Sequence, residues 1–291
     1  MSIRNRIRGF RYFFSRSREK EILMLGLPNS GKTVFFCVGM ELLQRSFNNL
    51  GKDYSVTYKD HDTQTMVSGV MKRLRAQEWP SATDPEFTLD ASARITYGGK
   101  VREIICRDFS GENFKDTFKG DFLLSGNKTL DEISEYLEKN NAVSTPGIIE
   151  KYLKDVKSAS SIALIIDSAM LYEDTDDDLY IELFHLMRFI KAGNKLKRLA
   201  LIFTKNDVAK KTPAQVKTEF ESRWPNVYAL LKEMKMDHEF FPASAVRCVV
   251  NKEAESDAPY IPPKGYSPLG NSQDIEDPLY WLLEMKKPTP S

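Results

Sequence analysis

The stretch GLPNSGKT, Gly26 to Thr33, constrains this chain most, because it matches GxxxxGKT between a predicted strand and a predicted helix. The apolar run Glu21 to Leu25 predicts the strand, and the helical spacing from Lys32 to Phe47 predicts the helix. A glycine-rich turn at a helix N-terminus presents backbone N–H groups to an anion. We therefore expect these groups to surround a phosphate, with Lys32 reaching its outer oxygens and the Thr33 hydroxyl ligating Mg²⁺.

A hairpin is predicted further along the chain. Phe87 to Tyr97 places apolar residues at every second position, which indicates a strand with one wet face. Gly98 and Gly99 form a turn, and Val101 to Asp108 returns as the partner strand.

Two near-continuous apolar runs indicate strands buried on both faces, Ser161 to Asp167 and Arg198 to Thr204. A helix is predicted between them over Leu179 to Ala192, and Glu239 to Ala245 is the last predicted strand. This alternation predicts an α/β fold: a three-layer sandwich around a mainly parallel sheet, with one antiparallel hairpin strand.

The C-terminal region is expected to close the domain. Residues 251–277 are rich in Pro, Gly, Ser and Asn and predict a long surface connection. Asp277 is expected to cap a last helix, with Pro278 in its first turn.

Composition indicates one large globular domain. The chain has 291 residues, 41% of them hydrophobic and 29% charged, and no apolar run has the roughly 18–20 residues of a spanning helix. The three cysteines, Cys37, Cys106 and Cys248, are far apart and match core thiols of a reducing compartment, so we expect a cytoplasmic protein. The net charge of +1 argues against a general nucleic-acid binder, and no specific nucleic acid is predicted.

Residues 1–20 form a basic, aromatic N-terminal arm, with arginines interleaved with Phe10, Tyr12, Phe13 and Phe14. This composition fits contact with an anionic membrane surface, a phosphate backbone or an acidic partner, and it equally fits an arm whose aromatic residues dock on their own domain. A peripheral position at a membrane is therefore one alternative.

A second group of polar residues follows the later strands. In TKND, a carboxylate at Asp207 can accept hydrogen bonds from both N1–H and the exocyclic amine of guanine, a donor pair that adenine lacks, and the stem of Lys205 can lie along the base. Ser244 and Ala245 follow the last predicted strand, where a backbone N–H can bond the guanine O6.

The order GxxxxGKT, DxxG (Asp108 to Gly111), TKxD, SA resembles that of the P-loop GTPases of the translation-factor and small-GTPase class, over most of residues 21–286. The resemblance implies an enzyme that binds GTP or GDP with Mg²⁺. It implies that Asp108 anchors Mg²⁺ through water and that Gly111 contacts the γ-phosphate. The residues expected to contact the nucleotide are Gly26, Pro28, Asn29, Ser30, Gly31, Lys32, Thr33, Val34, Thr204, Lys205, Asp207, Ser244 and Ala245.

Both switch regions are longer than in a minimal member of this class. We expect a GTPase domain over 21–286, with insertions at about 50–82 and 113–158, and a tail over 287–291. Thr83 is the favoured Mg²⁺-binding threonine of the first switch, with Thr88, Thr63 and Thr65 as alternatives. The strings WPSAT, DFSGEN and DPLYWLL also resemble bacterial GTPases of conflict and defence operons, including the double-GTPase families.

Glu112 stands where the best-known members carry a glutamine that orients water. An ionised glutamate only accepts hydrogen bonds and adds negative charge beside the γ-phosphate, so we expect slow intrinsic hydrolysis. Glu112 works as the catalytic residue if a basic group screens it or its pKa is raised. The alternative is that it points away and pairs with Lys115 or Lys119.

Three functions follow from these patterns. The first is a GTP-hydrolysing switch with Lys32, Thr83, Gly111 and Glu112 in its catalytic set, acting on a partner protein through the enlarged switches. The second is a scaffold or sensing module that holds GTP or GDP without significant turnover. The third is an ATPase or nucleotide kinase on the same phosphate-binding loop.

Overall fold

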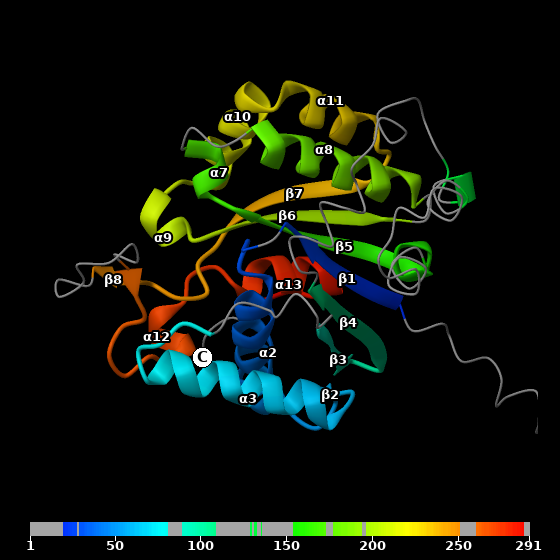
Figure 1. Cartoon of the computed structure of the whole chain (residues 1–291). Coiled ribbons are helices and arrows are strands. Elements are labelled where there is room, and N and C mark those ends of the chain that lie inside the picture. The colour runs from blue at the N-terminus through cyan, green and yellow to red at the C-terminus, as the bar shows by residue number, and fades with distance from the viewer. Residues whose placement is uncertain are drawn as a thin grey trace, which may run out of the picture.

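The computed structural model places the chain around one twisted sheet (Figure 1). It describes residues 20–27, 29–80, 89–108, 129, 131–132, 135, 154–172, 177–193, 196–250 and 260–287. No helix in these ranges has both the length and the apolar character needed to cross a membrane.

The sheet has seven strands in the order β2-β3-β4-β1-β5-β6-β7. Their bounds are β1 Lys20–Gly26, β2 Tyr54–Tyr58, β3 Leu89–Tyr97, β4 Lys100–Asp108, β5 Ala159–Asp167, β6 Arg198–Thr204 and β7 Asp237–Pro242. Strands β4, β1, β5, β6 and β7 pair in parallel, and β3 is antiparallel to both of its neighbours, β2 and β4. The expectation of a mainly parallel sheet with one antiparallel hairpin strand is confirmed.

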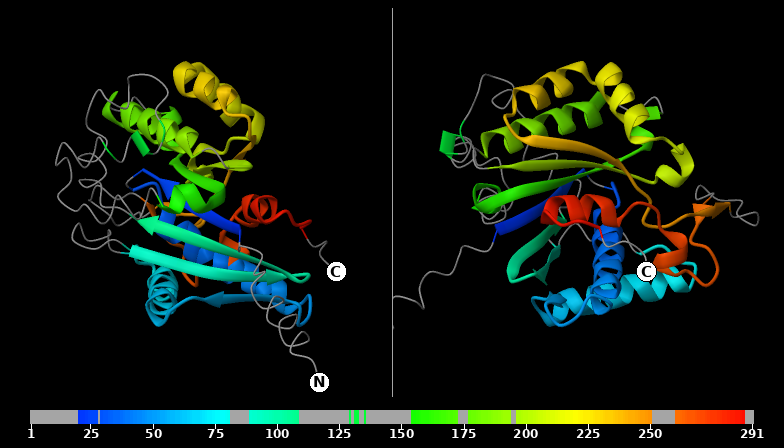
Figure 2. Two further views of the ribbon diagram at one scale, coloured as in Figure 1. Left: turned by 90° about the vertical axis from the view of Figure 1, so that its right-hand side faces the viewer. Right: turned by 180° about the vertical axis from the view of Figure 1, so that it is seen from behind.

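Helices cover both faces of the sheet, which makes three layers (Figures 1 and 2). Among the described residues, the helices with defined bounds are α2 Lys32–Asn48, α3 His61–Arg75, α7 Ala169–Tyr172, α8 Asp177–Ala192, α9 Asn206–Ala209, α10 Pro213–Arg223, α11 Pro225–Glu233, α12 Pro268–Asn271 and α13 Glu276–Leu283. One face carries α7, α8, α10 and α11, and the other carries α2, α3, α12 and α13. A short ribbon pairs β8 (Val249–Val250) with β9 (Tyr260–Ile261) outside this sheet.

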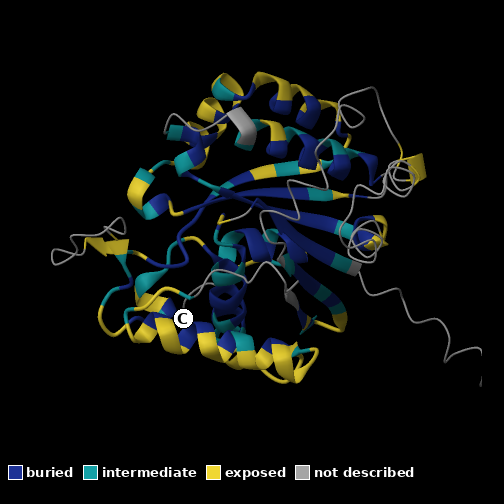
Figure 3. Cartoon of the chain, in the orientation of Figure 1, coloured by how far each residue is buried: buried dark blue, intermediate teal, exposed yellow. Residues whose placement is uncertain are grey.

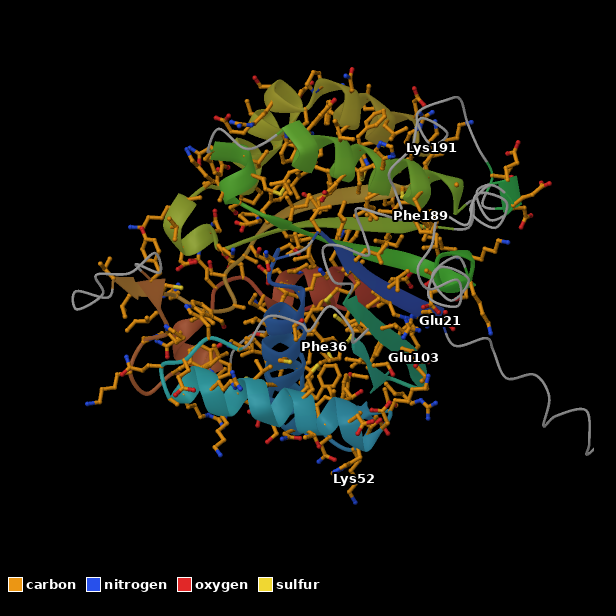
Figure 4. The ribbon with its side chains drawn as sticks, in the orientation of Figure 1. Glu21, Phe36, Lys52, Glu103, Phe189 and Lys191 are labelled. Atoms are coloured by element: carbon orange, nitrogen blue, oxygen red, sulfur yellow. The ribbon has the colours of Figure 1, made fainter. Side chains whose placement is uncertain are left out.

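Strand alternation divides the core into two clusters. In β1, Leu23 faces the cluster beneath α8 while Ile22 and Met24 face the cluster beneath α2. Phe189 of α8 and Phe36 of α2 belong to these two clusters on opposite sides of the sheet (Figure 4). The sheet is buried, and exposed residues gather on the outward faces of the helices (Figure 3). Such burial explains why β5 and β6 are apolar along almost their whole length.

Part of the expected first insertion forms regular structure that the sequence analysis missed. Strand β2 extends the sheet beyond β3, and α3 follows it. The Asp60 side chain caps α3 by accepting a 2.7 Å hydrogen bond from Thr63 N–H. The five-residue strand was missed because its short run, YSVTY, has only one buried residue, Val56.

Two expectations for the C-terminal region were wrong. Residues 260–277 are not simply a surface connection, since they contain β9, α12 and the buried Tyr266. Asp277 is not the cap of the last helix, because α13 begins at Glu276, and the Asp277 carboxylate pairs with Lys287 instead. Residues 288–291 of the expected tail lie outside the described residues.

Candidate functional site

The loop predicted to bind phosphate joins β1 to α2, and its two end glycines are required for different reasons. A Cβ atom added to Gly26 would lie 2.4 Å from the carbonyl oxygen of Ile165 on β5. Gly31, at the N-terminus of α2, has a φ of 81°, a conformation that favours glycine. Asn29 also has a positive φ, 58°. The loop therefore turns sharply while leaving the N-terminus of a 17-residue helix pointing into it.

Lys32 lies inside this turn and is only 4% exposed. Its Nζ donates a 2.9 Å hydrogen bond to Leu27 O, so the side chain folds back across the loop. Thr33 and Val34 are half-buried in the first turn of α2, and Pro28 lies outside the described residues. A buried ammonium beside a helix N-terminus is an environment that suits an anion.

The polar groups of the loop fit a phosphate. Within the described part of the chain, the hydroxyl of Ser30 is buried without a hydrogen-bond partner. A buried unpaired donor is costly, and a phosphate oxygen would satisfy it. This unpaired hydroxyl indicates a loop that suits an acceptor-rich ligand.

The TKND turn contacts this loop directly, although the two are far apart in the sequence. Thr204 ends β6, and its hydroxyl donates to Ser30 O at 2.7 Å and lies 3.2 Å from Ile166 O. The Nζ of Lys205 lies 3.4 Å from Asn29 O and pairs with the Asp167 carboxylate. Lys205 has a φ of 58° and stands at the N-terminus of α9. The tertiary structure thus brings the predicted phosphate site and the predicted base site together.

Asp207 and Ser244 form a second pair at the same edge of the sheet. The Asp207 N–H donates to Ser244 Oγ at 2.6 Å, and that hydroxyl donates to Asp207 Oδ1 at 2.7 Å. The second carboxylate oxygen, Oδ2, accepts from Cys248 N–H at 2.9 Å. These contacts hold the carboxylate in one orientation, and the carboxylate retains further acceptor positions for a ligand.

The segment after β7 leaves the sheet early to make this pair. The expected strand over Glu239 to Ala245 is too long, because β7 ends at Pro242 and Ser244 pairs with Gln273 in both directions, at 2.9 and 2.8 Å. Ala245 O accepts from Tyr266 O–H at 2.7 Å. Among the described residues, no acceptor is found for the N–H of the buried Ala245.

Sequence reasoning missed two residues of this site, Asp167 and Cys248. Asp167 ends β5 and is the register partner of Thr204, so a polar residue closing an apolar strand was an available signal. Cys248 contacts Asp207 through its backbone N–H, so the type of residue at this position gives no sign of the contact. Burial, followed by the neighbouring Asp207 carboxylate, raises the pKa of the Cys248 thiol to about 12.

Only some of the residues predicted for the two switches lie within the described ranges. Asp108 is the last residue of β4, next to β1, so its backbone lies at the same edge as the phosphate-binding loop. Before it, Arg107 pairs with Asp155 at 2.5 Å. Other predicted residues lie outside the described ranges: Thr83, Thr88, Gly111, Glu112, Lys115 and Lys119.

Two of the alternative switch threonines lie on α3, where their hydroxyls have other contacts. The buried Thr63 Oγ1 accepts from Ser92 N–H at 3.3 Å, which ties α3 to β3. The exposed Thr65 Oγ1 lies 3.5 Å from the His61 ring.

Comparisons with known proteins found matches among solved structures alone. No family model matches the chain, and no curated protein does. The putative nucleolar GTP-binding protein 1 of Plasmodium falciparum is 13% identical, with 93% of this chain and 88% of that chain covered and a TM-score of 0.40. The signal recognition particle receptor SRb-GTP/SRX complex of Chaetomium thermophilum is 12% identical, with 78% and 91% covered and a TM-score of 0.39. The ADP-ribosylation factor-like GTP-binding protein, or small COPII coat GTPase SAR1, of Encephalitozoon cuniculi, in complex with GDP, is 12% identical, with 97% and 93% covered and a TM-score of 0.36. At these identities and TM-scores, the case for a ligand rests on the geometry of the site.

Proposed function

We propose that the chain binds a guanine nucleotide between the phosphate-binding loop and the Thr204–Asp207 turn, and that it hydrolyses GTP slowly to GDP. The observation that carries this proposal is the 2.7 Å hydrogen bond from Thr204 Oγ1 to Ser30 O. It joins a loop suited to phosphate to a turn whose carboxylate suits the N1–H and amine of guanine. Either part alone would support a weaker conclusion.

The roles proposed for the residues follow from their positions. The backbone of Gly26–Thr33 would surround the phosphates, and Lys32, which reaches across the loop, would turn its ammonium to the phosphate oxygens. Asp207 would accept from the base edge and the Ala245 N–H would donate to its carbonyl. Bound Mg²⁺ neutralises phosphate charge, and Thr33, with Asp108 and Thr83, would hold it.

A slow rate is part of the proposal because of Glu112. Phosphoryl transfer depends mostly on positioning and charge neutralisation, and unaided GTP hydrolysis of this kind is on the order of 10⁻⁴ s⁻¹. The negative charge of an ionised Glu112 near the γ-phosphate opposes charge neutralisation, so we expect a hydrolysis rate at or below that value. A partner protein that supplies a cation would raise the rate by about 10³–10⁵.

Binding tests this proposal through two variants and two matched controls. Lys32→Ala should weaken GTP binding by about 10- to 100-fold, because it removes a charge-assisted hydrogen bond. Asp207→Asn should abolish the preference for GTP over ATP. The controls Lys232→Ala and Asp237→Asn change surface residues at other places and should bind GTP as the parent does. Unchanged GTP affinity in both site variants would refute the proposal.

Hydrolysis is tested by a single turnover with protein in excess over labelled GTP or ATP and Mg²⁺. Cleavage of GTP alone, with a rate changed by Glu112→Gln, supports a GTPase in which Glu112 handles the water or the charge beside it. Tight GTP binding without cleavage in either form supports the nucleotide-holding module instead. Equal competition by ATP supports an ATPase or nucleotide kinase.

We also propose a protein partner for the switch segments and a cytoplasmic location. Trp79 lies in the expected first insertion, close to the last described residue before the gap, and is 39% exposed, which supports a binding surface there.

The basic residues 1–20 would bind an anionic membrane or an acidic partner, and the resemblance to double-GTPase families supports a role in bacterial defence. Deleting residues 1–18 and measuring sedimentation with anionic vesicles tests the membrane alternative.

A further inference from the structure

The orientation of the Asp207 carboxylate depends on a backbone group outside the predicted motifs. Ser244 holds Oδ1, and the backbone N–H of Cys248 holds Oδ2. A carboxylate whose direction is set before the ligand arrives loses less conformational freedom on binding. The segment that positions Cys248 therefore influences the affinity of the Asp207 carboxylate for a base.

Cys248 leads directly into the ribbon β8–β9. Val249 pairs with Ile261 and Val250 with Tyr260, so each strand of the ribbon has only two residues. An isolated two-stranded ribbon is marginal in water even when it is longer than this one. Its position must therefore be set by contacts with the rest of the molecule.

The chain just after α3 supplies such contacts. Trp79 Nε1 donates to Tyr260 O at 3.0 Å, and Gln77 Nε2 donates to Pro262 O at 3.3 Å. Gln77 has a φ of 64°, and its N–H bonds back to Leu74 O at 3.2 Å, so the end of α3 turns sharply toward the ribbon. The ribbon and α12 lie on the same side of the molecule as this end of α3 in Figure 1 and in the right-hand view of Figure 2.

We propose that Trp79, through the ribbon β8–β9, is a positioning residue for the base-recognising carboxylate of Asp207. This inference rests on the proposed guanine site. It makes guanine affinity and the conformation of the chain at Trp79 mutually dependent, because coupling between two sites is reciprocal. Trp79 directly precedes the sequence that contains the favoured switch threonine, Thr83, so the base site and the first switch would be linked outside the phosphates.

The exposure of Trp79 and of the ribbon makes the coupling testable without unfolding the domain. Trp79 is 39% exposed and Val250 is 62% exposed, so neither belongs to the core. Trp79→Phe keeps an aromatic ring but removes the indole N–H that donates to Tyr260 O, together with part of the ring surface. Trp281→Phe, on α13, is the matched control, since Trp281 packs on Phe241 and Arg198 rather than on the ribbon.

The experiment measures dissociation constants of the full chain for GDP, for inosine diphosphate and for pyrophosphate, and those of the parent protein for ADP as well. Inosine diphosphate lacks the exocyclic amine, and pyrophosphate reports on the phosphate-binding loop alone. Trp79→Phe should weaken GDP binding by about 3- to 10-fold, the effect of one neutral hydrogen bond transmitted to the site. It should narrow the preference for GDP over inosine diphosphate and leave pyrophosphate unchanged, and Trp281→Phe should change none of the three.

A double-mutant cycle decides whether Trp79 acts through Asp207. In an Asp207→Asn background, Trp79→Phe should have no further effect on GDP affinity. The inference is overturned if Trp79→Phe changes GDP affinity by less than twofold, weakens pyrophosphate equally, or acts equally in both backgrounds. If the parent protein does not prefer GDP over ADP, the proposed function fails as well, whereas a clear preference that Trp79→Phe leaves intact overturns this inference alone.

Discussion

Gly26→Ala is expected to damage both the stability of the domain and its phosphate site. The new methyl group would lie 2.4 Å from Ile165 O and 2.9 Å from Ser30 Oγ, whereas ordinary contacts begin near 3.4 Å. Ile165 O belongs to the backbone of the central strand β5, so about 1 Å of relief would disturb the pairing of β1 and β5. We expect a loss of about 2–3 kcal/mol in the free energy of unfolding, in the upper part of the range for overpacking.

Two other glycines provide controls for the same substitution. A Cβ on Gly39 would lie 2.8 Å from Leu279 Cδ1, the end of a buried side chain and not a backbone atom, and alanine is the better helix former, so Gly39→Ala should cost only about 1 kcal/mol. Gly69 lies on the exposed face of α3 with nothing within 4 Å of an added Cβ. Gly69→Ala should therefore stabilise the protein by about 0.5–1 kcal/mol, because alanine is the better helix former.

Urea unfolding of the three variants gives their order of stability, and titration with GTP gives their affinities. Only Gly26→Ala should lose nucleotide affinity, because its methyl group also displaces Ser30 within the phosphate-binding loop. The steric reasoning is refuted if Gly26→Ala unfolds at the same urea concentration as Gly39→Ala, or if Gly26→Ala binds GTP as tightly as the parent.

Three further predictions concern a helix cap, a thiol and the aromatic core. Asp60→Ala should lower the free energy of unfolding, measured with urea, by about 0.5–2 kcal/mol at pH 7. Hydrogen bonds from Thr63 lower the pKa of Asp60, so the difference between the two proteins should be present above about pH 4 and disappear as the pH falls through the lowered pKa. Since burial, followed by the Asp207 carboxylate, raises the pKa of the Cys248 thiol to about 12, its alkylation at pH 8, followed by mass spectrometry, should be slow. Asp207→Asn should accelerate this alkylation, and an unchanged rate would contradict the contact. Phe220 packs against Phe203, Trp224, Tyr228 and Phe240 at centroid distances of 5.3–6.4 Å, so Phe220→Ala should destabilise the domain by about 3–5 kcal/mol, and a loss below 1 kcal/mol in urea unfolding would contradict this packing.

Strands with a strong local pattern were predictable, and weakly patterned elements were not. The run Arg198 to Thr204 matches β6 residue for residue, because a strand buried on both faces leaves a continuous apolar signal. The edge strand β2 left no such signal, since one of its faces is open. The helix cap expected at Asp277 failed because α13 begins one residue earlier, at Glu276, so Asp277 lies within its first turn and pairs with Lys287.

The sequence by itself determined the loop for which phosphate binding is proposed, and the polar residues at the strand ends. The loop depends on local backbone geometry, in which glycine and a helix N-terminus leave a pattern within eight residues. Parallel strands then bring their carboxyl ends to one edge, so Asp108, Asp207 and Ser244 could be placed there in advance.

Only the tertiary structure decided how these parts are joined. Three hydrogen bonds join these parts, and each has a backbone N–H or carbonyl group as one partner. They link Thr204 to Ser30, Cys248 to Asp207, and Trp79 to Tyr260 of the ribbon. Every residue carries such groups, with proline lacking only the N–H, so their pairing leaves no mark in the order of side chains. Which of them meet across long separations is set by the packing of the helices and the twist of the sheet.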